Sequence, residues 1–185
     1  MIKVVIFFSY FLFFLYSVLG YGFIFQNYVI KKKINQFYIG FLGAALVTTI
    51  SYFTIFYFYH GFAHNIVIHT IGFGYFLYSY FKDENKKYIK NITLISFIFL
   101  SLILISKTHD DFAYYHLTFT KYLTENHIIF GMGHLNHGYN LPSSLFYLNS
   151  TFYFPLIKFY SFHYINVFFY SLPLYSPLQR ELNFF

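Results

Sequence analysis

Two long stretches without a charged residue constrain this chain more than any other feature of its sequence. They run from Val4 to Ile30 and from Phe37 to Tyr59, and the basic triplet at residues 31–33 separates them. A helix that crosses a membrane needs about 20 mainly apolar residues, and both stretches are long enough. Soluble domains carry roughly 25% charged residues, whereas this chain has 10% charged and 58% hydrophobic residues. The sequence therefore predicts an integral membrane protein.

Two shorter apolar stretches, from Ile66 to Phe81 and from Ile92 to Ile105, predict a third and a fourth membrane helix. We therefore expect a four-helix transmembrane region over residues 1–106. The links after the first and third stretches are rich in Lys, so the positive-inside rule places both in the cytoplasm. Residues 60–65 and the segment after residue 105 then face outward. A signal-peptide core has only about 7–15 apolar residues, so we expect the first stretch to stay as an uncleaved helix.

The chain becomes more polar after residue 106, and we expect an extracytoplasmic loop over residues 107–143. The spacing of apolar residues from Phe112 to Asn126 predicts a helix that lies along the membrane surface. Residues 128–142 contain several Gly and a Pro, which is typical of a loop. Residues 144–185 are predicted to form membrane-associated or further transmembrane helices. The predicted fold class is thus all-α, a polytopic transmembrane bundle of about 4–6 spans.

Asp110 and Asp111 form an acidic pair at the predicted outer end of the fourth helix. Paired carboxylates bind Mg²⁺ or Mn²⁺, usually together with phosphate oxygens of a substrate. Alternatively, one of them serves as a general base. His109 and His116 flank the pair, are seven residues apart and fall near one helix face. A structural reading is also open, since Asp at the start of a helix caps free backbone N–H groups.

A second group of polar residues lies in the Gly-rich loop, with imidazoles at His127, His134 and His137 and an amide at Asn136. Neutral imidazoles suit a transition metal, and the two His residues three apart have plausible ligand spacing. The loop equally suits a polar substrate, or side chains that simply face water. We expect substrate-binding residues at His134, Asn136, His137 and Lys121. The chain has no Cys, which excludes disulfides, thiol catalysis and Cys-ligated metals.

The segment "THDDFAYYHLTFTKYL…FGMGHLNHGYNLPSSLFYLNSTFYFP" resembles the first large outer loop of a group of uncharacterised bacterial polytopic membrane proteins. These are similar in layout to GT-C-type glycosyltransferases. The resemblance covers roughly residues 105–165 and implies that Asp110 and Asp111 occupy the acidic position of that superfamily. Such a pair is implied to act on a metal, on a lipid-phosphate sugar donor, or as the base for the acceptor. GT-C proteins usually have one span before this loop, whereas four are predicted here.

The resemblance implies an enzyme of the bacterial inner membrane that transfers a sugar from a polyprenyl-phosphate donor to a glycan acceptor on the outer face. The alternative is a non-enzymatic integral membrane protein, such as a transporter component or an assembly subunit. We expect membrane lipids as partners and no nucleic acid, because the Lys residues lie where membrane topology places them. GT-C proteins have many spans after the outer loop, so we expect this chain to be the N-terminal part of a longer protein.

Overall fold

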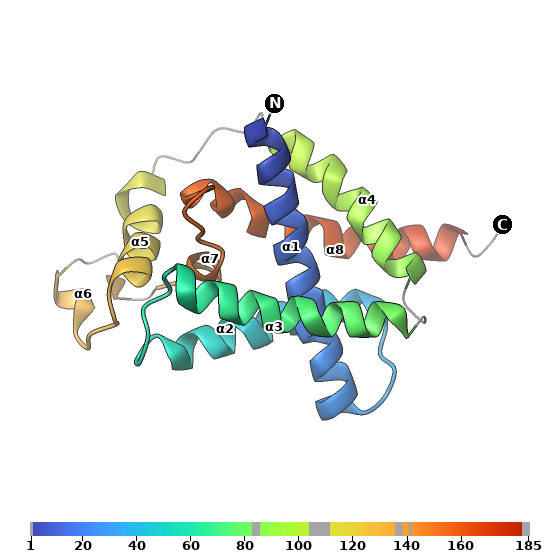
Figure 1. The fold of residues 1–185 in the computed structure, drawn as a ribbon, viewed down its shortest axis with the longest axis horizontal. Coiled ribbons are helices and arrows are strands. Elements are labelled where there is room, and N and C mark those ends of the chain that lie inside the picture. The colour runs from blue at the N-terminus through green and yellow to red at the C-terminus, as the bar shows by residue number, and fades with distance from the viewer. Residues whose placement is uncertain (1, 83–85, 104–111, 136–138, 141, 183–185) are drawn as a thin grey trace. The chain divides into compact units, whose positions relative to one another are not determined.

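The computed structural model describes residues 2–82, 86–103, 112–135, 139–140 and 142–182 (Figure 1). Within these ranges the chain is helical and contains no strand, as the sequence predicts. The α-helices are α1 (Ile2–Ile24), α2 (Gln36–Thr54), α3 (Phe62–Phe81), α4 (Lys86–Ile103), α5 (Leu117–Glu125), α6 (Met132–Leu135), α7 (Ser144–Thr151) and α8 (Phe162–Leu182). Two π-helical segments, η1 (Phe25–Ile30) and η2 (Phe112–His116), and one 3₁₀ segment, η4 (Phe159–Ser161), accompany them.

The residues group into two compact units that are not continuous in sequence. Unit 1 consists of Met1–Leu46, His69–Ser106 and His163–Phe185, and unit 2 of Val47–Ile68 and Lys107–Phe162. Helices α2 and α3 therefore contribute residues to both units. The predicted division of the chain at residues 106 and 143 stays a prediction.

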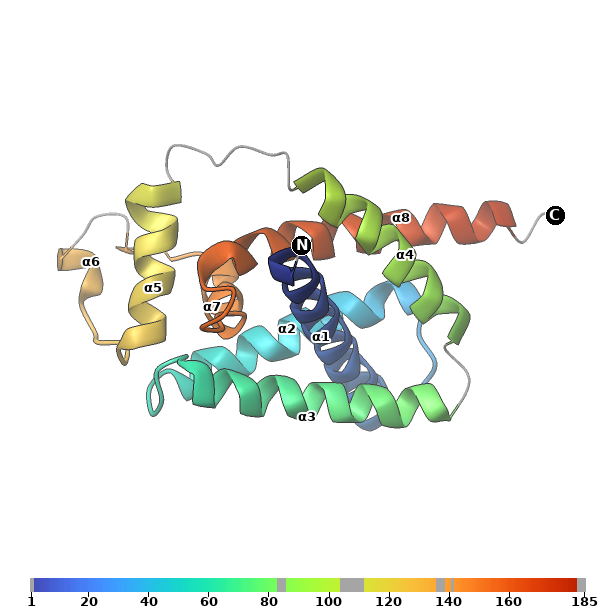
Figure 2. The ribbon, with the colours of Figure 1, turned by 45° about the horizontal axis from the view of Figure 1, so that its top comes forward.

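Helix α1 crosses α2 and α3 (Figure 2), and close backbone contacts at glycine hold these helices together. A Cβ on Gly20 of α1 would lie within 3.0 Å of the backbone oxygen of Gly72 in α3. A Cβ on Gly43 of α2 would lie equally close to the backbone oxygen of Val18 in α1. Contacts between membrane helices typically use small residues in this way, because lipid provides no hydrophobic force between helices. Gly43 thus lets α2 approach the backbone of α1 closely.

Polar side chains in unit 1 are paired across helices. The Nδ1 atom of buried His69 in α3 lies 3.0 Å from the Ser17 hydroxyl in α1. The hydroxyl of Tyr164 in α8 donates to the backbone oxygen of Phe7 at 2.6 Å. His69 thus bonds a neighbouring helix, as a polar group in a water-poor interior must.

Two helical stretches are long and apolar enough to cross a membrane, Lys3–Ile30 with 28 residues and Gln36–Thr54 with 19 residues. A core helix of a soluble protein or a signal sequence also passes this test. Within the protein, 44% and 33% of their most apolar windows are buried. These two helices indicate membrane association. The four to six predicted spans are not confirmed, because α3 carries His and Asn and α4 begins with lysines.

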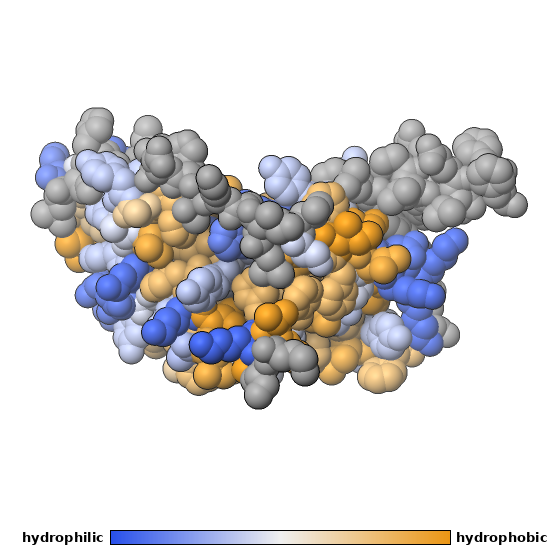
Figure 3. All heavy atoms as spheres, turned by 90° about the horizontal axis from the view of Figure 1, so that it is seen from above, coloured by the Kyte–Doolittle hydropathy of each residue, from blue (hydrophilic) through white to orange (hydrophobic). Residues whose placement is uncertain are grey.

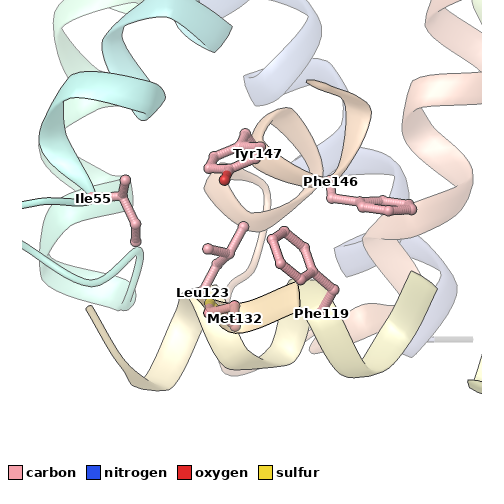
Figure 4. Close-up of a cluster of buried hydrophobic side chains, with 6 residues drawn as sticks. All are labelled: Ile55, Phe119, Leu123, Met132, Phe146 and Tyr147. Atoms are coloured by element: carbon pink, nitrogen blue, oxygen red, sulfur yellow. The ribbon is translucent and has the colours of Figure 1, made fainter. Parts of the chain in front are cut away.

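Unit 2 has an apolar core between α5, α6, α7 and the end of α2 (Figure 4). Its buried members are Ile55, Phe119, Leu123, Met132, Phe146 and Tyr147. The helix predicted over residues 112–126 is present as η2 followed by α5. Its buried apolar side chains, Phe119 and Leu123, belong to this core, so that side of the helix packs on protein.

Apolar side chains are also common at the surface. Figure 3 shows orange apolar residues over much of the described surface on that face, with blue polar residues among them. In unit 2 the chain after α2 exposes a run of rings at Phe56, Tyr57, Phe58 and Tyr59, which are 49% to 74% exposed. Exposed apolar surface of this extent marks contact with a membrane or a partner.

Candidate functional site

The structure describes only some of the predicted site residues. Asp110, Asp111 and His109 lie outside the described residues, as do Asn136 and His137. The predicted metal pair therefore stays a prediction. Among the residues that the structure does describe, no three His, Cys, Asp or Glu side chains are placed to hold a metal ion.

The described members of the predicted site are His116, Lys121 and His134, and each has a different environment. His116 ends η2, and its ring packs at 5.0 Å on Phe146 and at 4.3 Å on Tyr115. Lys121 is exposed on α5, with its Nζ 3.8 Å from a carboxylate oxygen of Glu125. His134 is exposed on α6 and lines a cleft. Of the two predicted substrate-binding residues that the structure describes, Lys121 and His134, only His134 lines this cleft.

This cleft in unit 2, which we call the loop cleft, has a volume of about 320 Å³. Its walls come from the Gly-rich segment, from Phe56 just after α2 and from Phe119 of α5. Phe130 is 93% exposed and lies 5.9 Å from Phe56, centroid to centroid. A ring so exposed buries little apolar surface within the described part of the chain and is accessible at the cleft.

The polar wall of the loop cleft consists of His134 and the amide of Asn140. Gly131 has φ of +84°, a conformation that residues with a Cβ rarely adopt. A Cβ on Gly133 would collide with the Asn140 side chain, so only glycine lets this amide pack against the short helix. The two glycines thus shape the cleft wall that presents the imidazole and the amide.

A second polar cluster, around residues 60–65, is buried in unit 2. His60, Asn65, Ser51 and Ser150 each have 0% exposure. The ring of His60 lies 2.5 Å from the Ser150 hydroxyl through Nδ1 and 3.2 Å from the Ser51 backbone oxygen through Nε2. Because a carbonyl only accepts, the ring proton is on Nε2. Nδ1 is then an acceptor for the Ser150 hydroxyl. The hydroxyl has one proton and two acceptors within reach, Nδ1 and the Tyr147 backbone oxygen at 2.7 Å.

Two further side chains complete the His60 cluster. The Asn65 amide nitrogen donates to the backbone oxygens of His60, Ser150 and Tyr153 at 2.8, 2.9 and 3.0 Å. The His64 ring stacks on His60 at 4.7 Å and lies 2.9 Å from the Thr54 hydroxyl. These bonds connect the turn after α2 with the end of α7. The sequence signal for them is the pair of His residues four apart followed by Asn.

The His60–Ser150 pair has the arrangement of a base and a nucleophile, but its environment argues against catalysis. Burial, with a smaller contribution from the neighbouring His64 ring, lowers the pKa of His60 to about 3. A general base works best with a pKa near the operating pH. Neither side chain is exposed to a substrate. The cluster therefore serves to hold unit 2 together, and the loop cleft is the better candidate site.

Comparisons with known proteins give a family but no function. No curated protein and no solved structure matches the chain. One family model, described as a domain of unknown function (DUF8201), matches residues 1–185. Because this match covers the whole chain, the protein belongs to the DUF8201 family.

Proposed function

We propose that this chain is the membrane-embedded part of a glycosyltransferase-like enzyme. It would transfer a sugar from a polyprenyl-phosphate-linked donor to a glycan acceptor on the outer face of the bacterial inner membrane. The observation that carries the proposal is the loop cleft, where an exposed ring at Phe130 accompanies His134 and Asn140. A sugar has apolar C–H faces that pack on an aromatic ring, and hydroxyls that bond to imidazole and amide groups.

A second hollow in unit 2 supports the lipid part of the donor. It has a volume of about 590 Å³ and is lined mainly by apolar side chains such as Tyr57, Phe58 and Val67. An isoprenoid chain is apolar and flexible, and such a lining suits it. Among the polar side chains in this lining, His64 is bonded to Asn65 and Thr54, whereas His127 is exposed. An imidazole beside an apolar chain suits the phosphate that a polyprenyl donor carries.

The proposed reaction follows from the acidic pair that directly precedes η2. A carboxylate of Asp110 or Asp111 takes the proton of the acceptor hydroxyl, whose oxygen bonds to the anomeric carbon of the donor sugar. The bond between that carbon and the phosphate oxygen breaks, and polyprenyl phosphate leaves with the electron pair. His116, His134 and Lys121 are candidates to bind the phosphate or the acceptor, because imidazole and ammonium groups donate hydrogen bonds.

Transfer of labelled sugar from a polyprenyl-phosphate donor, in membranes that contain the protein, tests the proposal. We expect Asp110→Asn or Asp111→Asn to lower the rate by about 10²-fold or more, the usual contribution of a general base. Glu125→Gln is the matched control, because that carboxylate is exposed on α5 and paired with Lys121. Phe130→Ala should raise the KM for the sugar substrate, whereas Phe53→Ala, which removes another exposed ring of unit 2, should not.

The alternative is a non-enzymatic membrane protein in which the acidic pair only caps a helix. The burial of His60 and Ser150 and the low pKa of His60 favour this reading, because this imidazole and hydroxyl are in contact but not exposed to a substrate. Normal transfer in both Asp variants, at unchanged protein levels, would exclude the enzyme and leave this alternative.

A further inference from the structure

Four aromatic residues in succession follow the end of α2 in unit 2, namely Phe56, Tyr57, Phe58 and Tyr59. We call this segment the aromatic turn. All four residues are exposed. Single apolar side chains at a protein surface are normal, but a run of four exposed rings on one short turn is not explained in that way. The aromatic turn is therefore a candidate contact surface.

The fold holds the aromatic turn in a defined conformation. Ile55, directly before it, is buried in the apolar core of unit 2 (Figure 4), and His60, directly after it, is buried in the polar cluster. The N–H groups of Tyr57 and Phe58 both donate to the backbone oxygen of Thr54, at 2.9 and 2.8 Å. The rings are thus presented by a turn that is fixed at both ends, and not by a loose segment.

The length of α2 places the aromatic turn where a spanning helix would leave the membrane. Its 19 residues extend about 28 Å at a rise of 1.5 Å per residue, and the hydrocarbon core of a bilayer is about 30 Å thick. The helix begins at Gln36, just after the basic triplet, and the four rings follow its other end at Thr54. Membrane proteins concentrate aromatic residues at both membrane–water boundaries, where a ring with a polar tip suits the change of environment. Tyr57 and Tyr59 have such a tip.

The sequence around the aromatic turn carries no charge that a membrane would have to dehydrate. Residues 34–81 contain no Asp, Glu, Lys or Arg. The imidazoles that follow the turn, His60 and His64, are bonded within unit 2, and burial lowers the pKa of both, so both are neutral at neutral pH. A protein partner would also cover exposed rings, but it would not explain why they follow a charge-free helix of membrane-spanning length.

We propose that the aromatic turn anchors unit 2 in the head-group region of the bilayer that α2 crosses. The apolar rings of Phe56 and Phe58 suit the upper part of the acyl chains, and the hydroxyls of Tyr57 and Tyr59 suit the ester and phosphate oxygens of the lipid. Phe56 is also part of the wall of the loop cleft. The anchor therefore keeps the loop cleft close to the membrane surface.

Tryptophan fluorescence of the purified chain in phosphatidylcholine vesicles tests the proposal. The chain has no Trp, so a single introduced Trp reports on one position. Bromine on an acyl chain quenches a nearby indole, and lipids brominated near the head group or near the chain end therefore report its depth. We expect Tyr57→Trp to lose more emission with bromine near the head group. Phe53→Trp, which lies within α2, should lose more with bromine near the chain end.

Lys121→Trp is the matched control, because this exposed residue of unit 2 lies on α5 beside the carboxylate of Glu125. Iodide in the water should quench it, and neither brominated lipid should quench it strongly. Lipid quenching of Tyr57→Trp no stronger than that of the control would overturn the proposal, as would protection from both iodide and lipid, which indicates a protein interface. Deeper quenching of Tyr57→Trp than of Phe53→Trp would also overturn it, because the turn would then lie inside the span. These measurements involve no sugar donor, so their outcome is independent of the proposed sugar transfer.

Discussion

Replacing Gly20 by Ala tests whether backbone contact between α1 and α3 holds unit 1 together. The new Cβ would lie within 3.0 Å of the backbone oxygen and carbon of Gly72, and 3.0 Å from the backbone nitrogen of Phe76. These are main-chain atoms, so they cannot rotate away, and the two helices would have to separate. Gly74, also in α3, provides a matched control, because a Cβ there meets no atom within 4 Å.

The magnitude follows from two opposing effects. In a helix, Ala is more favourable than Gly by roughly 0.8–1.0 kcal/mol. For Gly74→Ala nothing opposes this gain, and we expect a stabilisation of about 0.5–1 kcal/mol. For Gly20→Ala, overpacking typically destabilises by about 1–3 kcal/mol, and contact with immobile backbone atoms favours the upper end. We therefore expect Gly20→Ala to be less stable than Gly74→Ala by about 3 kcal/mol.

Thermal unfolding of both variants in the same detergent, followed by far-ultraviolet circular dichroism, gives the comparison. The chain contains no Trp, so helix content is a better signal than tryptophan fluorescence. Equal stability of the two variants, or a Gly20→Ala protein more stable than wild type, would refute the argument. In that case the α1–α3 contact would not contribute to the fold of unit 1.

Two further predictions concern the buried cluster of unit 2. The pKa of His60 is about 3 in the folded chain and has its ordinary value of 6.5 in the unfolded chain. The unfolded chain therefore binds a proton at this ring more tightly than the folded chain does. The stability from neutral His60 is thus complete above that ordinary pKa and falls by up to about 1.4 kcal/mol per pH unit below it. His60→Gln should flatten this decline in an acid titration, and an identical decline would contradict it. Asn65→Leu should destabilise by about 3 kcal/mol, because three backbone acceptors lose their donor. Asn126→Leu, at an exposed position of unit 2, should change stability by less than about 0.5 kcal/mol, and equal losses would show that the buried bonds contribute nothing.

The helical class and the helix positions follow from the sequence, but some boundaries do not. The stretch predicted to start at Ile66 begins as helix α3 at Phe62, and the one predicted at Ile92 begins as α4 at Lys86. The apolar pattern does not detect a first helical turn made of polar residues, although polar residues form helix as readily as apolar ones. At the other end, α2 stops at Thr54, before the exposed aromatic run that hydropathy alone assigns to the membrane.

Contacts between distant residues were beyond the reach of the sequence. Ser150 is 90 residues from His60, and Tyr75 is 48 residues from Asn27, so neither bond has a local signal. The basic triplet at residues 31–33 predicts only which side of the membrane this link faces, because the positive-inside rule concerns topology and not side-chain contacts. Conversely, the imidazole of His134 was singled out from its Gly-rich surroundings, and glycines do shape the cleft that it lines.

The two units stabilise their helix contacts by different means, and this difference indicates where chemistry is available. Unit 1 combines backbone approach at glycine, which works in lipid, with a few interhelical bonds such as the one between His69 and Ser17. Unit 2 relies on an apolar core and on buried bonds of His60 and Asn65, whose polar groups are already used by backbone and hydroxyl partners. Polar side chains that are bonded and buried have no capacity for a ligand. The imidazole of His134 is exposed at the loop cleft and retains that capacity, so substitutions there will separate function from folding.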